Sequence, residues 1–134
     1  MEARFLLDTN TCIYIRRRRP PELLARFQHL RPGEAALSIV TYCELCYGAE
    51  KSVARIKAVK DLEEFASLIQ VLPLPAEAAR IYGVIRANLQ VKGEVIGGND
   101  LWIVAHAKAM NLTLVTNNER EFKRVGGLKV QNWI

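Results

Sequence analysis

Short apolar segments alternate along this sequence with longer segments of helical character. The longer segments place apolar residues at three- or four-residue spacing, as amphipathic helices do. We predict strands at residues 4–7, 36–40, 69–72, 112–116 and 128–130, and helices at 9–18, 21–30, 41–49, 52–68, 75–92, 100–110 and 119–122. Strands that alternate with helices of this length favour an α/β fold, with a mostly parallel central sheet flanked by helices on both faces.

The length and composition predict one domain. A chain of 134 residues that is 50% hydrophobic can bury a core of its own. No linker, low-complexity block or internal repeat divides it, so we expect residues 1–134 to form a single domain. No apolar run approaches the ~20 residues that span a bilayer, and the amino terminus lacks the order of a secretion signal. We therefore expect a cytoplasmic protein without a membrane partner.

The three cysteines give no sign of a disulfide framework or a zinc site. Cys43 and Cys46 form a Cys-x-x-Cys, but neither a second such pair nor a spaced histidine pair accompanies them. At helical spacing these two cysteines share a face with Tyr47, which favours core packing.

Polar residues follow two of the predicted strands. Asp8 comes directly after the first strand, and Thr116 and Asn118 lie at and after the fourth. In parallel sheets ligands bind beyond the carboxyl ends of the strands, so these side chains should share one edge. Glu44 lies on a helix face next to a threonine and a glycine, and Asp100 lies in the first turn of its helix. We expect the acids to converge.

Convergent carboxylates suit a hard divalent cation. Mg²⁺ is typically held by one or two carboxylates together with waters and substrate phosphates, which leaves room for a phosphodiester. We expect Thr9 or Asn10 to cap the first helix. Asp8 and Asp100 each have a structural alternative as well, because either could cap a helix. The joint occurrence of Asp8, Glu44 and Asp100 favours a Mg²⁺ or Mn²⁺ nuclease site.

The net charge of +5 and pI near 9.3 favour a polyanionic partner. The most concentrated positive charge is the run Arg16, Arg17, Arg18 and Arg19, which two prolines follow. The prolines should stop a helix and leave the guanidinium groups at its end. A solvated helix terminus would also explain this run, but its proximity to Asp8 favours contact with RNA.

Four ordered motifs and a carboxyl-terminal segment can be recognised along the chain. They are Leu6-Leu7-Asp8-Thr9-Asn10; Ser38 and Thr41 ahead of Glu44-Leu45 and Gly48; Ile96-Gly97-Gly98-Asn99-Asp100-Leu101-Trp102-Ile103 with Ala105-His106-Ala107; Val115-Thr116-Asn117-Asn118 with Glu121-Phe122; and Gly127 to Val130 with Trp133. Together they resemble the PIN domain over nearly the whole chain, most closely the VapC toxins of type II toxin-antitoxin pairs.

The resemblance implies a Mg²⁺- or Mn²⁺-dependent endoribonuclease that cleaves RNA with a metal-activated water. Asp8, Glu44 and Asp100 match the metal-binding acids of the family, and Thr116 matches a hydroxyl at its site. Asn118 stands where many members carry Asp, which lowers the negative charge of the site, and Glu121 is a candidate to compensate.

The resemblance also implies partners. These are an RNA substrate, a tRNA such as initiator tRNA above all, and a small VapB-type antitoxin that inhibits the toxin. A homodimer and a toxin-antitoxin hetero-oligomer are expected, with operator DNA bound only through the antitoxin.

Two other classes of protein stay open on the residues alone. The first is a non-catalytic RNA- or antitoxin-binding module, in which Asn118 reports a weakened site. The second is a phosphoryl-transfer α/β protein, which would want a second acid beside Asp8, where Thr9-Asn10 follows instead. His106 is interpreted as a packed or surface histidine rather than a catalytic one.

Overall fold

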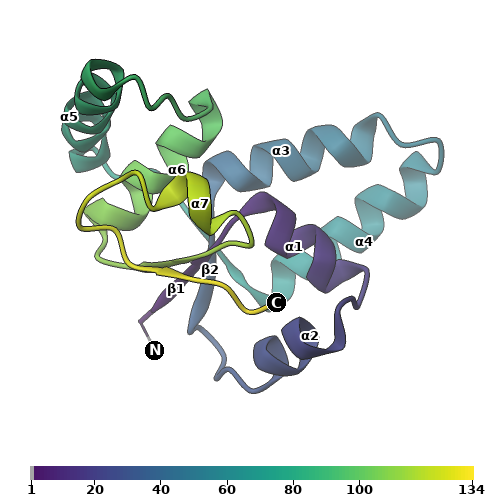
Figure 1. Cartoon of the computed structure of the whole chain (residues 1–134). Helices are drawn as coiled ribbons and strands as arrows, with labels where there is room; N and C mark the ends of the chain where they lie inside the picture. Colours follow the sequence, from purple (N-terminus) through teal and green to yellow (C-terminus); the bar gives the residue numbers. More distant parts are fainter. Residues whose placement is uncertain (1) are drawn as a thin grey trace.

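The computed structural model describes residues 2–134 and is built on a five-stranded parallel sheet (Figure 1). Its strands are β1 (Phe5–Leu7), β2 (Ala35–Ser38), β3 (Gln70–Leu72), β4 (Thr113–Val115) and β5 (Val130–Gln131). They lie in the order β3-β2-β1-β4-β5, and all four neighbouring pairs are parallel. The chain therefore starts in the middle of the sheet and extends it first to one side and then to the other.

Seven helices connect the strands. They are α1 (Thr9–Arg16), α2 (Pro21–Gln28), α3 (Ile39–Glu50), α4 (Arg55–Leu68), α5 (Glu77–Lys92), α6 (Gly98–Ala109) and α7 (Glu119–Phe122). Helices α1 to α4 cover one face of the sheet, and α5 to α7 cover the other. Helices α3 and α4 pack together as a hairpin that extends away from the sheet (Figure 1). The predicted α/β fold with helices on both faces is confirmed.

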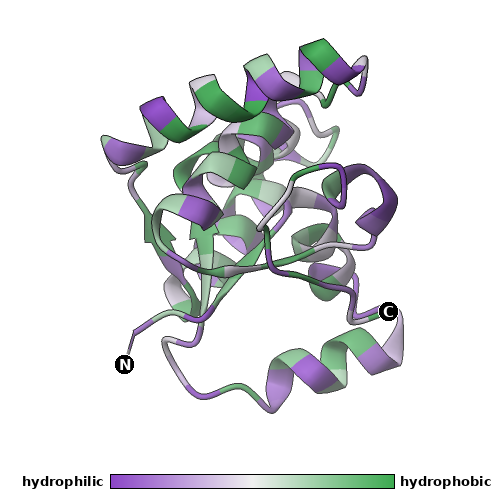
Figure 2. Cartoon of the chain, turned by 60° about the vertical axis from the view of Figure 1, so that its left-hand side comes forward, coloured by the Kyte–Doolittle hydropathy of each residue, from purple (hydrophilic) through white to green (hydrophobic). Residues whose placement is uncertain are grey.

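Strand residues alternate between two cores. In β1, Phe5 and Leu7 pack with α1 to α4, whereas Leu6 packs with α5 and α6. This alternation follows from the two-residue period of a strand, and burial on both faces explains why the strands read as continuous apolar runs. Figure 2 shows the central strands in hydrophobic colours, between helices whose hydrophilic and hydrophobic residues alternate.

Several predicted boundaries were wrong by a few residues. The second strand stops at Ser38, because its side chain accepts a hydrogen bond from Val40 N at 3.1 Å and starts α3 there. Helix α4 starts at Arg55 rather than residue 52, and the last strand is Val130–Gln131 rather than 128–130. Helix α6 starts two residues before Asp100, after Gly97.

Two predicted packing faces were also wrong. The helix predicted at 52–68 has apolar residues at helical spacing, but Val53 and Ile56 precede or open α4 and are exposed. Only the later ones, Leu62 and Phe65, are buried. On α3, Cys43 and Tyr47 are exposed, whereas Cys46 of the same predicted face packs against the core. Across residues 2–134, no helix combines the length and the apolar character that crossing a membrane requires.

Candidate functional site

The polar residues that follow β1 and β4 lie at one edge of the sheet, as parallel pairing requires. Asp8 N donates to Val115 O at 3.0 Å, so the ends of the two strands are joined at this point. Helix α3 begins at the same edge directly after β2, and it brings Glu44 toward Asp8. The strand order also changes direction between β1 and β4, which is the usual place for a ligand in such sheets.

Asp8 is nearly fully buried and accepts hydrogen bonds from Thr11 and Thr116. Its Oδ1 accepts a hydrogen bond from Thr11 N at 2.8 Å, so Asp8 caps α1, where a cap at Thr9 or Asn10 was predicted. Burial raises the pKa of Asp8, hydrogen bonds from Thr11 and Thr116 oppose that rise, and the negative charge of Glu44 adds to it. Capping and a ligand role are therefore compatible here, because a carboxylate has a second oxygen.

Glu44 is half-buried and is oriented by a residue from another helix. Thr9 Oγ1 donates to Glu44 Oε1 at 2.6 Å, which links the start of α1 to the middle of α3. One turn further on, a Cβ at Gly48 would meet no atom within 4 Å. The face of α3 that carries Glu44 is therefore open beyond the acid, as expected from the sequence.

Asp100 has the most perturbed carboxyl group of the site. Burial, followed by the charges of Glu121, Asp8 and Glu44, raises the pKa of Asp100 to about 6. The alternative that Asp100 caps its helix does not hold, because the N-cap of α6 is Gly97 and no side chain caps it. Asp100 thus has no structural hydrogen-bonding role at the helix start that would explain an acid there.

The segment after β4 completes the site. Thr116 is buried, and its Oγ1 accepts a hydrogen bond from Asn118 N at 2.9 Å. Asn118 Nδ2 donates to Glu121 Oε2 at 2.6 Å, and the Glu121 carboxylate helps to raise the pKa of Asp100. Asn118 therefore orients a fourth acid, which is the kind of compensation that the sequence suggested for Glu121.

The donor set fits a divalent cation. Asp8, Glu44, Asp100 and Glu121 take part in none of the ion pairs found within residues 2–134. The charge of Glu44 helps to raise the pKa of Asp8, and the charges of Glu121, Asp8 and Glu44 help to raise the pKa of Asp100. In the same range no three His, Cys, Asp or Glu side chains lie close enough to enclose one metal ion. One or two of these carboxylates with waters and phosphate oxygens is the coordination that Mg²⁺ usually takes.

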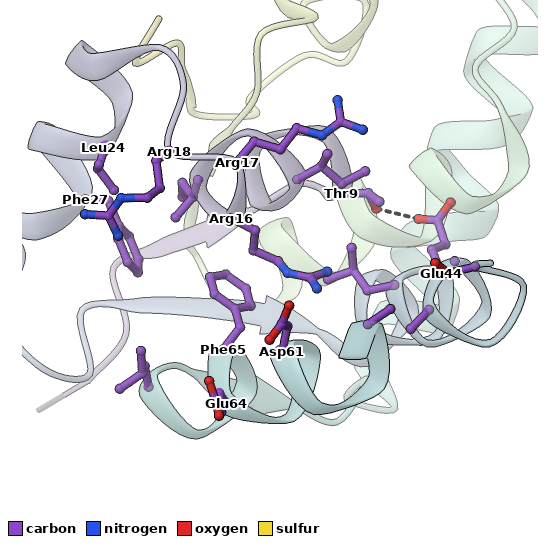
Figure 3. Close-up of a pocket in the computed structure, with 18 of the residues that line it drawn as sticks. Thr9, Arg16, Arg17, Arg18, Leu24, Phe27, Glu44, Asp61, Glu64 and Phe65 are labelled. Carbon is purple, nitrogen blue, oxygen red and sulfur yellow. Dashed lines mark hydrogen bonds between the residues drawn. The ribbon is translucent and has the colours of Figure 1, made fainter. Parts of the chain in front are cut away.

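A cleft of about 760 Å³ adjoins the acids between α1, α2, α3 and α4 (Figure 3). Thr9 and Glu44 lie at one end of it, and apolar side chains such as Phe27 and Phe65 line its depth. Of the predicted RNA-contact residues, Arg16, Arg17 and Arg18 line this cleft.

The four arginines have different surroundings. Arg16 points toward Asp61 on α4, whose pKa its charge helps to lower (Figure 3). Arg17, Arg18 and Arg19 are exposed after the end of α1. Arg19 lies outside the cleft and lines a separate hollow with Tyr14 and the prolines.

Sequence reasoning missed Thr9 as a residue of the site. Its position next to Asp8 suggested only a helix cap, since nothing in the sequence shows that its hydroxyl reaches a glutamate 35 residues away.

Comparison with known proteins gives one family over almost the full length. The PIN domain matches residues 5–128. The ribonuclease VapC2 of Haemophilus influenzae is 42% identical over 131 residues, covering 98% of each chain. The tRNA(fMet)-specific endonuclease VapC of Shigella flexneri is 44% identical over 130 residues, covering 97% of this chain and 98% of that protein.

A solved structure agrees with these sequence relatives. The crystal structure of DNA-bound VapBC from Salmonella typhimurium superposes with a TM-score of 0.92 at 40% identity. The alignment covers 98% of this chain and 99% of that chain, so the likeness includes every element around the acids.

Proposed function

This chain belongs to the PIN-domain family, and from that membership we propose that it is a divalent-metal-dependent endoribonuclease, the toxin of a VapBC-type pair. The observation that carries the proposal is the group of facing acids, in which the pKa of Asp100 is raised to about 6. Relatives named as ribonucleases and a tRNA endonuclease at over 40% identity support the activity. A non-catalytic module would have no need for this costly arrangement of charge.

Each residue of the site has a proposed role. One or two of Asp8, Glu44 and Asp100 would bind Mg²⁺ or Mn²⁺ directly, and the remaining acids, with Glu121, would face its waters. When bound, the cation supplies positive charge opposite the phosphoryl oxygens and lowers the pKa of an attacking water. Thr116 keeps Asp8 in place, and Thr9 does the same for Glu44. Asn118 holds the Glu121 carboxyl.

The reaction proposed is hydrolysis of an RNA phosphodiester. The oxygen of water would form the new bond to phosphorus, and the bond from phosphorus to the ribose 3′ oxygen would break. The products would be a 5′-phosphate and a 3′-hydroxyl. We propose tRNA as the substrate class, because a relative that is 44% identical is named for tRNA(fMet).

The proton and the cation should compete for the acids. Since the pKa of Asp100 is about 6, its carboxyl is ionised at pH 7 and protonated at pH 5. At limiting Mg²⁺ we expect the cleavage rate to fall about tenfold from pH 7 to pH 5, with a midpoint near 6 that moves down as Mg²⁺ is raised. A rate that is flat over this range at limiting Mg²⁺ would contradict the assignment of Asp100.

The arginines after α1 should bind the RNA backbone. We expect Arg17→Gln with Arg18→Gln, on an Asp100→Asn background that cannot cleave, to weaken tRNA binding about 3- to 30-fold near 0.1 M salt. The slope of binding against salt should also fall. Arg80→Gln, an exposed arginine on α5, is the control. Equal binding by both variants in a filter or anisotropy assay would remove the RNA role of Arg17 and Arg18.

An antitoxin and other subunits complete the proposal. The solved relative is a VapBC complex with DNA, so we propose that a VapB-type antitoxin binds this chain and contacts the operator. The apolar depth of the cleft beside Glu44 is a suitable place for its inhibitory segment. We also propose a homodimer within the toxin-antitoxin hetero-oligomer.

The activity is tested with the purified, antitoxin-free chain and total tRNA in Mg²⁺, in Mn²⁺ and in excess chelator. We expect fragments with 5′-phosphates only when a cation is present. Cleavage that continues in chelator, or fragments with 2′,3′-cyclic phosphates, would contradict the proposed mechanism.

A further inference from the structure

A buried polar contact joins α3 to α6, the two helices that carry Glu44 and Asp100. Ser38 ends β2 and caps α3, and the Nδ1 atom of His106 on α6 lies 2.8 Å from Ser38 Oγ. Both side chains are 0% exposed, so the bond lies inside the molecule where α3 and α6 pack together. His106 is therefore a buried residue and not a surface one.

The surroundings of this contact determine where its hydrogen atoms lie. Burial lowers the pKa of His106, so the ring is neutral. Ser38 Oγ already accepts a hydrogen bond from Val40 N, so its hydroxyl can donate to Nδ1 and the ring proton then lies on Nε2. His106 Nε2 and Thr41 Oγ1 are buried and find no partner among residues 2–134.

Stability does not explain why polar residues occupy this junction. Buried polar atoms without partners oppose folding, and apolar side chains of the same shape are often neutral or favourable in their place. Ser38 has a local reason to be present as the cap of α3, but His106 has none in α6. The effect of His106 is to fix α6 against the start of α3.

The contact lies where it can affect the positions of the two acids. Glu44 lies six residues after Ser38, and Asp100 lies six residues before His106. Each acid is therefore about 9 Å along its helix from the same fixed point. A rotation of α6 by about 10° around that point would move Asp100 by about 1.5 Å, which is enough to impair catalysis strongly.

We propose that the Ser38–His106 hydrogen bond is a positioning contact that sets the separation of Asp100 and Glu44. The inference rests on the proposed function, because that function gives the separation its importance. Neither residue touches substrate in this account. Both act through the helices that they join.

The test compares His106→Leu, which removes the bond at similar volume, with His106→Asn, whose amide can reach Ser38 from the place of Nδ1. His29→Leu is the control, because His29 is exposed at the C-cap of α2 and its ring bonds to Ala25 O of that helix. For the wild type and each variant we would measure kcat and KM for tRNA, the thermal midpoint of unfolding, and the affinity for Mn²⁺ by electron paramagnetic resonance.

For His106→Leu we expect kcat to fall at least tenfold with KM within threefold, Mn²⁺ affinity to fall at least threefold, and the thermal midpoint to stay or rise. His106→Asn should recover much of kcat, and His29→Leu should match the wild type. The proposal is overturned if folded His106→Leu keeps kcat and Mn²⁺ affinity, or if Asn is no better than Leu.

The Mn²⁺ measurement separates this proposal from the nuclease. If wild type binds Mn²⁺ without cleaving tRNA and His106→Leu binds it more weakly, the positioning contact stands and the proposed function fails. If wild type cleaves and both His106 variants cleave equally well, the function stands and the positioning contact fails. Should Ser38→Ala be used as the partner variant, its loss of the α3 cap is read from the thermal midpoint.

Discussion

Replacement of Asp100 by Asn should abolish RNA cleavage and at the same time make the metal-free protein more stable. The loss of activity should exceed about 10³-fold, because the amide removes a charged ligand from the proposed cation site. Few substitutions in this chain should have a larger effect on cleavage. The combination of the two effects is what distinguishes a functional acid from a structural one.

The gain in stability follows from the raised pKa. The folded protein binds the Asp100 proton more tightly than the unfolded chain does. In the unfolded chain the pKa of this carboxyl has its ordinary value of 3.8. Between pH 3.8 and about 6 this group takes up a proton on folding, so its contribution to stability falls as pH rises through that range. Above pH 6 it is ionised in both states, and its charge is less favourable in the folded protein than in the unfolded chain. At pH 7, Asn should therefore raise the free energy of unfolding by about 1–3 kcal/mol.

Thermal or urea unfolding in chelator at pH 7 and pH 4 measures this effect. The advantage of Asp100→Asn over wild type should shrink toward pH 4, where the wild-type carboxyl is protonated in the folded protein and partly protonated in the unfolded chain. Mg²⁺ should stabilise the wild type and leave the variant largely unaffected. A variant that is less stable than wild type at pH 7 would show that Asp100 has a structural partner.

Substitutions of Asp8 should affect stability and cleavage differently from those of Asp100, because Asp8 has both a capping role and a proposed ligand role. Asp8→Asn keeps an oxygen for Thr11 N, and Asn is a good N-cap, so the fold should be retained. Cleavage should nevertheless fall by more than about 10³-fold, because the charge is lost.

Asp8→Ala removes both roles. Thr11 N and the Thr116 hydroxyl then lose a buried acceptor, so this variant should unfold about 1–2 kcal/mol more easily than Asp8→Asn. Paired urea titrations and single-turnover cleavage assays give the comparison. Full cleavage by Asp8→Asn would mean that Asp8 is a helix cap and nothing more.

The positions of the acids at one edge could be predicted because strand order hardly matters to them. Any parallel sheet brings the residues after its strands to one edge, so Asp8 and Thr116 had to lie at the same edge once the strands were identified. The helix that carries Glu44 could also be predicted, from the spacing of its residues. The all-parallel order with β1 in the centre came only from the structure.

Other features depend on contacts that no local pattern encodes. The Thr9–Glu44 and Ser38–His106 bonds join residues that are far apart in sequence, and their geometry is decided by how the helices pack. The exposed Val53 shows that a local pattern can also mislead. Helical spacing does not tell which of the apolar residues on a helix another element covers.

The measurement that tests the central claim most directly is titration of Mn²⁺ into the antitoxin-free wild type, followed by electron paramagnetic resonance, beside Asp8→Asn and Asp100→Asn. The account predicts that wild type binds Mn²⁺ at neutral pH and that each variant, though folded, binds it at least tenfold more weakly. Equal affinity in all three proteins would show that these acids are not the cation site.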